Sequence, residues 1–414
     1  MTDAYRPPGH VVVVGAGIVG LSTAHFLRRH DVAVTVLERR QVASGASWGN
    51  AGWLSPALAV PLPEPATLRA GLSGFMTPSA PLYVPPDPRL VPFLTSLARH
   101  STRRHWQASL AALTPLNRAA LDAHAALAAE GVTSEPMEPC LIATRAPEQR
   151  ESIVDELRHV HAAGQPVEFE LLDGAAAREA VPLLSEEVGY ALQVHGQRYI
   201  DPGRYVGALG AAVRRAGVRI EEGAEVRSVH DTGTGVELRM RAGDAVRADA
   251  VVLAPGASLD RLARPFGVHR RVQAGRGYSF SVVPERMPPG PVYFPAEKVV
   301  FTPLGERLRV SGMMEFRPAD APLSRSRIAS IVHAARPLVR GIDWASRADE
   351  WVGARPCTAD GLPLIGPTLS PRVHVAGGHG MWGVTQGPAT GLLLAETIAT
   401  GVPRPELAAL HPLR

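Results

Sequence analysis

The sequence is poor in cysteine, with only Cys140 and Cys357 in 414 residues. So sparse a pair is not the pattern of a disulfide-stapled secreted protein, and it suits a reducing cytoplasm. No charged stretch followed by an apolar run precedes Val11, so we expect no signal peptide. No apolar run approaches the length of a membrane-spanning helix. These absences predict a cytoplasmic protein, and they leave open a peripheral position at the inner face of the cell membrane.

The sequence also lacks a large excess of one charge, because 43 Lys and Arg against 39 Asp and Glu leave a net charge of only +4. Basic residues gather only in short clusters such as residues 103–105, so we expect no nucleic-acid partner. The 15 histidines are scattered, and His159 and His161, two residues apart, would point to different sides of a helix. We therefore predict no metal site.

Glycine, in contrast, is plentiful, and three glycines mark the most informative stretch. Four valines, at residues 11–14, predict a buried strand that runs into a GxGxxG turn. A helix over residues 21–29 follows, and then a second strand over residues 32–37 that ends at Glu38. Strand, glycine turn, helix, strand and terminal acid are the parts of a dinucleotide-binding βαβ unit.

Each residue type has a physical role in such a unit. Gly15 takes the tight turn, Gly17 has no side chain to block a pyrophosphate, and Gly20 lets the helix pack close to the strand. The helix N-terminus presents free N–H groups to negative charge. Glu38 can accept both ribose hydroxyls and would repel a 2′-phosphate. The motif does not by itself distinguish FAD from NAD.

Later junctions repeat this pattern of a strand that meets small residues. A strand predicted over residues 246–253 enters a small-residue turn at residues 254–258. Another, over residues 373–376, enters glycines before a final helix over residues 384–400. A loop of small residues at 44–53 offers further backbone to a flat ligand. Junctions spread so widely imply one long ligand that is held by distant segments.

The proline-rich segment 56–92, which contains Leu68–Phe75, is interpreted as an extended lid or crossing segment. Packing of its apolar residues in the core is favoured over a peripheral membrane contact, which stays open. Elsewhere periodicity predicts helices over 89–130 (with Pro115 near a helix start), 148–163, 174–181, 202–216 and 324–339, and strands over 167–172, 218–220, 225–229, 235–240, 268–283, 292–302 and 307–314.

With these segments identified, the chain resembles the FAD-dependent D-amino-acid oxidase superfamily, most closely its bacterial D-amino-acid dehydrogenase branch. The resemblance covers nearly all of the chain, and its motifs occur in the order typical of that family. They are Gly15 to Gly20 with Glu38, Asn50-Ala51-Gly52, Arg276-Gly277-Tyr278, Arg355-Pro356 with Asp360-Gly361, and Gly378-His379-Gly380 through Gly383.

The resemblance implies FAD as the cofactor. Relatives with covalent flavin use a cysteine in the C-terminal region, and Cys357 stands at another offset, so we expect non-covalent FAD. The last helix would point its positive end at the flavin N1 and O2. The residues expected along the cofactor are Gly15, Gly17, Ile18, Val19, Gly20, Glu38, Arg39, Ser47, Asn50, Ala51, Gly52, Val226, Ala254, Gly256, Gly378, His379, Gly380, Met381, Gly383, Val384 and Thr385.

Arg355 matches the position at which this superfamily holds the substrate carboxylate, which a guanidinium can grip with two hydrogen bonds. The alternative is a buried arginine paired with Asp349 or Glu350. Tyr278 is the second catalytic candidate, as a hydroxyl donor to the carboxylate or as a pocket wall, and a core tyrosine is an equal alternative. His379 is expected to shape backbone near the flavin, not to act as a base. The expected substrate pocket consists of Trp53, Phe301, Met381 and Trp382.

The implied reaction is oxidative deamination of a D-amino acid. The neutral amine form loses its α-hydrogen as hydride to flavin N5, and the imino acid is hydrolysed to a 2-oxo acid and ammonia. No general base is needed if the amine binds neutral. Electrons then pass to a quinone, another carrier or oxygen. The alternatives are an oxidase of glycine, sarcosine or secondary amines such as D-proline, an NAD-dependent dehydrogenase, and a non-catalytic flavin-carrying subunit.

Length and composition suit two interleaved domains with a large core. We predict an α/β fold in which a Rossmann-like FAD-binding domain, residues 1–60, 165–260 and 345–414, alternates along the chain with a substrate domain. The substrate domain, residues 61–164 and 261–344, is predicted to be α+β and built on an antiparallel sheet.

Overall fold

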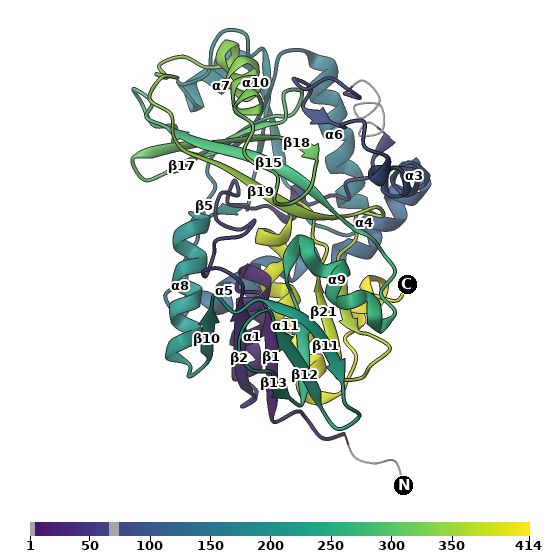
Figure 1. The fold of residues 1–414 in the computed structure, drawn as a ribbon. Coiled ribbons are helices and arrows are strands. Elements are labelled where there is room, and N and C mark those ends of the chain that lie inside the picture. Colours follow the sequence, from purple (N-terminus) through teal and green to yellow (C-terminus); the bar gives the residue numbers. More distant parts are fainter. Residues whose placement is uncertain (1–4, 66–73) are drawn as a thin grey trace.

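The computed structural model describes residues 5–65 and 74–414, and two large sheets dominate it (Figure 1). A six-stranded sheet occupies the lower half of the view and a nine-stranded sheet the upper half. The sheet with the glycine turn is mostly parallel as predicted, and the sheet above it is mostly antiparallel but contains two parallel pairings. Most of the apolar stretch Leu68–Phe75 falls on residues 66–73, outside the described residues.

The six-stranded sheet has the order β10-β2-β1-β14-β21-β20, with all neighbours parallel except β20 and β21. Its central strand consists almost entirely of valines, and Val11, Val12 and Val13 are fully buried. Such a run is expected of a strand covered on both faces. The strands are β1 (His10–Val14), β2 (Ala33–Glu38), β10 (Arg219–Glu222), β14 (Ala250–Leu253), β20 (Leu364–Pro367) and β21 (Val373–Gly377).

Helices cover one face of this sheet and a small sheet covers the other. Val11 and Val13 pack with the helices, whereas Val12 and Val14 pack with the small antiparallel sheet β11-β12-β13 and with α9. The helices on the first face are α1 (Ile18–Arg28), α4 (Arg103–Arg118), α5 (Ala120–Ala128), α8 (Pro202–Arg215) and α11 (Gly383–Thr400). The second face holds β11 (Val226–Asp231), β12 (Val236–Met240), β13 (Val246–Ala248) and α9 (Leu259–Ala263).

The nine-stranded sheet has alternating faces. Tyr278, Phe280 and Val282 point to the face that α7 and α10 cover, so Ser279 and Ser281 point to the opposite face. That opposite face meets the cofactor half. The strands are β4 (Leu82–Tyr83), β6 (Cys140–Thr144), β7 (Phe169–Asp173), β8 (Tyr190–Val194), β15 (Val272–Val282), β16 (Val292–Phe294), β17 (Val299–Leu304), β18 (Arg307–Phe316) and β19 (Ala348–Thr358).

The remaining described elements are mostly short. They are the helices α3 (Val91–His100), α6 (Pro147–Ala162), α7 (Gly174–Ala180) and α10 (Arg325–Ala335), the 3₁₀ helices η1 (Pro56–Leu58), η2 (Pro88–Leu90), η3 (Gly256–Ser258), η4 (Arg264–Phe266), η5 (Arg336–Leu338) and η6 (Pro405–Leu410), and the three-stranded sheet of β3 (Trp53–Leu54), β5 (Glu135–Pro136) and β9 (Arg198–Tyr199).

The structure differs from the predicted elements at three places. Pro115 lies inside α4 and not near a helix start. The strand expected over residues 246–253 is two strands, because β13 pairs with β12 whereas β14 joins the parallel sheet. The strand expected over residues 292–302 is likewise two, because β16 and β17 pair with each other as a hairpin.

The domain boundaries remain a proposal, which the sheet pairings allow us to refine. β7 and β8 pair with β6, and β19 pairs with β15, so these strands belong to the nine-stranded sheet. We propose that the substrate unit takes in residues 165–194 and 348–358, which the sequence division assigned to the FAD-binding unit. Within the described ranges, no helix has the length and apolar character needed to cross a membrane.

We predict that Gly20→Ala strongly destabilises the fold. A Cβ at Gly20 would lie 2.0 Å from the carbonyl oxygen of Gly15, so α1 and the glycine turn would have to separate. The expected loss is about 2 to 3 kcal/mol of unfolding free energy, measured by urea titration. Gly207→Ala in α8 is the matched control, because no heavy atom lies within 4 Å of its added Cβ. It should be neutral or slightly stabilising, and equal losses in both variants would contradict the close-approach argument.

Candidate functional site

A long groove runs across the carboxyl ends of β1, β2, β14 and β21, where ligands of open α/β sheets bind. On its other side it reaches β19 of the nine-stranded sheet, so the groove lies between the two halves. Segments from the whole chain line it, namely residues 14–20, 37–40, 44–47, 50, 224–226, 254–258, 261–262, 319, 352–356, 376–377, 379–381 and 383–384.

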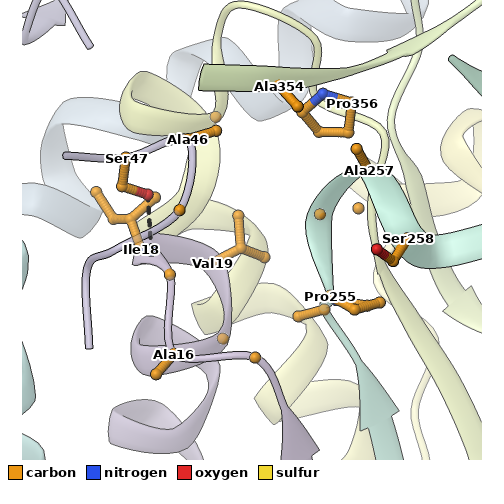
Figure 2. A pocket seen from close by; sticks show the side chains of 18 of the residues that line it. Ala16, Ile18, Val19, Ala46, Ser47, Pro255, Ala257, Ser258, Ala354 and Pro356 are labelled. Atoms are coloured by element: carbon orange, nitrogen blue, oxygen red, sulfur yellow. Dashed lines mark hydrogen bonds between the residues drawn. The ribbon is translucent and has the colours of Figure 1, made fainter. Parts of the chain in front are cut away.

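The glycine turn forms one wall of the groove. Gly15 has φ of +109°, and a Cβ there would lie 2.4 Å from the carbonyl oxygen of Ala254. Gly17 is the N-cap of α1 and brings no side chain, so this residue does not cover the N–H groups of the first turn. Ser47 Oγ accepts a hydrogen bond of 3.3 Å from the N–H of Ile18 (Figure 2). This arrangement can cradle a pyrophosphate.

Glu38 lies at the end of β2 and lines the groove. One carboxylate oxygen accepts from the N–H of Ala16 at 2.8 Å, and the other accepts from the N–H of Arg40 at 2.9 Å. Two backbone donors therefore fix the carboxylate, and its remaining lone pairs are available to ribose hydroxyls. Arg39 also lines this end and donates to Ser258 Oγ at 3.3 Å.

The loop of residues 44–53 lies between the two halves. Ser279 Oγ donates to the carbonyl oxygen of Gly49 at 2.9 Å, and Thr302 Oγ1 donates to that of Ala51 at 2.8 Å. Asn50 Oδ1 accepts from the N–H of Gly52 at 2.8 Å and stabilises the turn. Ser47 and Asn50 line the groove, whereas Ala51 and Gly52 are outside its lining.

Arg355 lines the groove from β19. Its side chain crosses β15 at Gly277, where an added Cβ would lie 2.1 Å from Nη2, and Nη1 donates to the carbonyl oxygen of Met313 at 3.3 Å. Asp349 pairs with Arg307, and Glu350 with Arg347, so neither neutralises Arg355. Among residues 5–65 and 74–414, no carboxylate lies within salt-bridge distance of Arg355.

Burial lowers the pKa of Arg355, because desolvation disfavours a charged guanidinium. A buried cation with no counter-charge is costly, and a bound carboxylate would remove that cost. The site therefore favours an anionic ligand group next to β15.

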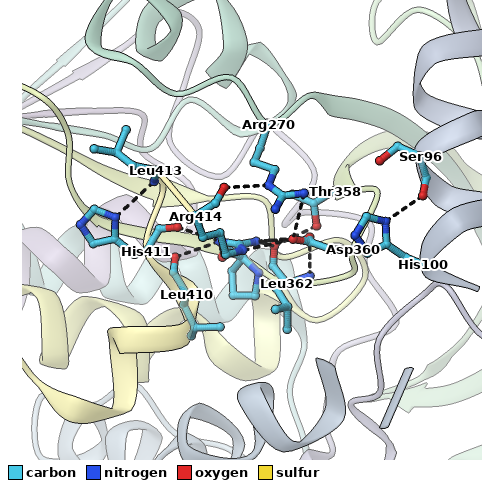
Figure 3. A network of polar contacts seen from close by, with 11 residues as sticks. Ser96, His100, Arg270, Thr358, Asp360, Leu362, Leu410, His411, Leu413 and Arg414 are labelled. Atoms are coloured by element: carbon cyan, nitrogen blue, oxygen red, sulfur yellow. Dashed lines mark hydrogen bonds and ion pairs between the residues drawn. The ribbon is translucent and has the colours of Figure 1, made fainter. Parts of the chain in front are cut away.

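A polar network fixes the turn that follows β19. Asp360 receives two hydrogen bonds from Arg414, from Nε at 3.1 Å and from Nη2 at 3.2 Å (Figure 3). A Cβ at Gly361 would lie within 3 Å of Pro61 and Pro63, so this turn packs directly on the chain that enters the lid segment. The network holds the end of the strand that carries Arg355.

Two of the predicted site residues lie on the other face of the nine-stranded sheet. Tyr278 is 1% exposed and donates to Glu315 Oε1 at 2.6 Å, and Phe301 is fully buried in the same apolar cluster. Neither Tyr278 nor Phe301 lines the groove. Strand alternation turns their neighbours Gly277 and Thr302 to the face of the sheet that meets the cofactor half. This placement corrects the expectation of direct substrate contact and favours the core-tyrosine alternative for Tyr278.

The other predicted pocket residues lie near the groove. Met381 lines it, and Trp382 lines a small adjoining cavity with Gly378 and donates to the carbonyl oxygen of Val60 at 2.8 Å. Trp53 Nε1 donates to Thr302 Oγ1 at 3.0 Å, which places this indole against the polar face of the sheet.

His379 is buried, and burial lowers its pKa to about 4. The ring is therefore neutral at neutral pH, with Nε2 at 2.8 Å from Thr390 Oγ1. His379 lines the groove as an uncharged group, and Gly383 and Val384 at the N-terminus of α11 line it beside His379. Thr385 is outside the lining and donates to the carbonyl oxygen of Trp53 at 2.9 Å.

The sequence reasoning missed Ser279, Thr302 and the loop residue Ala319, which lines the groove. The alternation along β15, which is apolar at 278, 280 and 282 and polar at 279 and 281, was a signal for Ser279. No local signal marks Ala319, because it lies on a loop that only the fold brings to the groove.

The residues present fit FAD. The glycine cradle and open helix end suit a pyrophosphate, Glu38 suits an unphosphorylated ribose, and the N-terminus of α11 suits the electron-rich pyrimidine edge of a flavin. This match rests on residues from three separate segments of one continuous groove.

The sequence was compared with known proteins. Residues 10–397 match the family model described as FAD dependent oxidoreductase (DAO). A protein named D-amino acid dehydrogenase from Xanthobacter autotrophicus is 29% identical over 98% of both chains. One of the same name from Cereibacter sphaeroides is 31% identical over 97% of this chain and 94% of its own.

The fold was compared with solved structures. Glycine oxidase from Geobacillus kaustophilus superposes with a TM-score of 0.73 at 24% identity, covering 98% of each chain. L-proline dehydrogenase from P. horikoshii superposes with a TM-score of 0.71 at 17% identity, covering 99% of this chain and 98% of its own. At these identities the likeness shows the fold alone.

We predict that Glu38→Ala weakens FAD binding about ten- to a hundredfold, because hydrogen bonds to a charged group contribute about 1.5 to 3 kcal/mol. The measurement is fluorescence titration of the apoprotein with FAD. The FAD affinity of Glu38→Gln, which keeps one acceptor oxygen, should lie between those of the wild type and of Glu38→Ala. Glu221→Ala, a carboxylate outside the groove on the neighbouring strand β10, is the control. Wild-type affinity in Glu38→Ala would contradict the assignment.

Proposed function

Because the chain belongs to the FAD-dependent oxidoreductase (DAO) family, we propose that it oxidises D-amino acids to 2-oxo acids and ammonia with non-covalently bound FAD. The observation that carries this proposal is the guanidinium of Arg355, half-buried beside the groove with no carboxylate partner in the described chain. Relatives named D-amino acid dehydrogenase match over nearly the whole chain and support the choice of substrate class.

Arg355 orients the substrate in this proposal. It binds the α-carboxylate with two parallel N–H donors, and in a D-amino acid this grip turns the α-hydrogen toward the groove. The flavin, when bound, supplies a two-electron acceptor for that hydrogen as hydride. Positioning of this kind supplies much of what such a reaction needs from the protein.

No side chain needs to remove a proton from Cα. The amine reacts in its neutral form, and the imino product is hydrolysed by water after oxidation. His379, the imidazole in the groove lining, is held neutral by burial and hydrogen-bonded to Thr390, so it shapes the wall. The open N–H groups at the start of α11 stabilise negative charge at the pyrimidine edge.

The environment of Cys357 supports non-covalent attachment. The thiol is buried, and burial raises its pKa to about 11, which keeps it protonated and unreactive. An added Cβ at Gly275 would lie 2.7 Å from its Sγ, so the thiol packs against β15.

We propose that the electron acceptor is a quinone or another carrier and not oxygen. The dehydrogenase names of the relatives support this choice. A membrane-borne quinone would be reached by peripheral contact at the inner face of the membrane. Phe75, Met76 and Val91 of the lid segment support such a contact, since each is at least half exposed.

We predict that D-amino acids bleach the flavin spectrum under anaerobic conditions and that L-amino acids do not. In Arg355→Met, kcat/KM should fall at least about a hundredfold, because a charge-assisted pair worth about 3 kcal/mol is lost. Arg355→Lys should retain part of the wild-type kcat/KM, since lysine keeps the positive charge but lacks the two parallel N–H donors.

Arg347→Met is the control, an exposed arginine just before β19 that does not line the groove. A flavin that bleaches only with glycine or sarcosine would replace the proposed substrate class with the glycine-oxidase alternative. Bleaching by D-amino acids that persists at full rate in Arg355→Met would remove Arg355 from the mechanism.

We further predict that the D-amino-acid-reduced protein is reoxidised faster by a water-soluble quinone analogue than by air-saturated buffer. Stopped-flow absorbance at the flavin band measures both rates, and a peroxide assay measures the oxygen product. Stoichiometric hydrogen peroxide and rapid reoxidation in air would identify an oxidase instead.

A further inference from the structure

Helix α11 carries a proline in a position that leaves a backbone acceptor without its usual partner. Pro388 has no N–H, so it cannot donate to the carbonyl oxygen of Val384, four residues earlier. Val384 lies in the first turn of the helix and lines the groove beside Gly383. The carbonyl without a main-chain donor therefore belongs to a residue that lines the groove in which the flavin is expected to bind.

A side chain from another helix meets this carbonyl. His124 of α5 lies with Nε2 at 3.1 Å from the carbonyl oxygen of Val384 and at 3.2 Å from that of Thr385. Carbonyl oxygens can only accept, so Nε2 must carry the proton. The other ring nitrogen, Nδ1, is then an acceptor, and the hydroxyl of Tyr205 of α8 donates to it at 2.7 Å.

The surroundings hold the ring in this one state. His124 is 2% exposed and Tyr205 4%, and burial lowers the pKa of His124 to about 4. The imidazole is therefore neutral at neutral pH. A neutral ring whose Nε2 faces two carbonyl oxygens has a single suitable tautomer, and the hydroxyl of Tyr205 completes it by donating to the unprotonated Nδ1.

We propose that His124 is a positioning residue, which supplies from its side chain the hydrogen bond that Pro388 removes from α11. It thereby holds the first turn of α11 at the angle that presents the N–H groups of Gly383 and Val384 to the groove. Tyr205 holds the ring in place by donating to its other nitrogen, Nδ1. The inference rests on FAD occupying the groove but is independent of which substrate is oxidised.

Neighbouring contacts hold side chains of the same turn but leave this backbone position to His124. Thr385 Oγ1 donates to the carbonyl oxygen of Trp53, and Gln386 Nε2 donates to Asn117 Oδ1 at 2.8 Å. Neither replaces a donor to the Val384 carbonyl. A proline in a helix interior displaces the carbonyl four residues before it, which turns that carbonyl outward to an external partner.

The test is a rescue experiment with His124→Leu and Pro388→Ala. His124→Leu leaves the Val384 carbonyl buried without a donor, so FAD affinity of the apoprotein should fall about five- to tenfold. Amide hydrogen exchange of residues 383–387 in the apoprotein should also speed up. Adding Pro388→Ala restores a main-chain N–H at the correct spacing, and the double variant should recover most of both effects.

Three further variants sharpen the result. Tyr205→Phe should shift both readouts in the same direction by a smaller amount, since it removes only the hydroxyl that donates to Nδ1 and leaves the Nε2 contacts in place. Pro388→Ala alone should bind FAD like the wild type. His25→Leu is the control, a histidine in α1 that is equally buried and makes no hydrogen bond from its ring in the described chain.

Outcomes that overturn the proposal are equally specific. Unchanged FAD affinity and amide exchange in His124→Leu would show that the ring does not hold the turn. Losses that add in the double variant, with no recovery, would show that His124 acts through packing. If FAD binds but no amino acid bleaches it, the proposed function fails while this inference is still tested, since neither readout involves substrate.

Discussion

Among the hydrogen bonds that join the halves of this molecule, two hold the loop beside the groove, and the arrangement of the groove depends on them. Ser279 and Thr302, on neighbouring parts of the nine-stranded sheet, hold the carbonyl groups of Gly49 and Ala51. The loop that contacts the cofactor groove is thereby attached to the sheet that carries Arg355. Small polar side chains are needed at these positions, because a buried carbonyl without a donor would cost about 1 to 3 kcal/mol.

The glycine turn, Glu38 and the final helix were predictable from the sequence because their signals are local. A run of valines, three spaced glycines and an acid about twenty residues later define one unit, and the structure places β1, α1 and β2 there. The resemblance to a family then supplied FAD and the importance of Arg355, which neither composition nor periodicity shows.

Other features depend on contacts that the local sequence does not contain. Tyr278 and Ser279 are adjacent in one strand, and only the packing of α7 and α10 decides which of them faces the groove. Residues 246–253 read as one strand, yet β13 and β14 join different sheets. The role inferred for His124 also requires the fold, because α5 and α11 are brought together from distant parts of the chain.

The strand order of the parallel sheet has a consequence for synthesis on the ribosome. β14 sits between β1 and β21, and β21 begins about 120 residues after β14 ends. At roughly 5 to 20 residues per second, one edge of β14 stays unpaired for about 6 to 24 s while the chain emerges. An exposed apolar strand edge is prone to pair with other chains. The interleaved order therefore leaves this edge open to pairing with other chains until β21 has been synthesised.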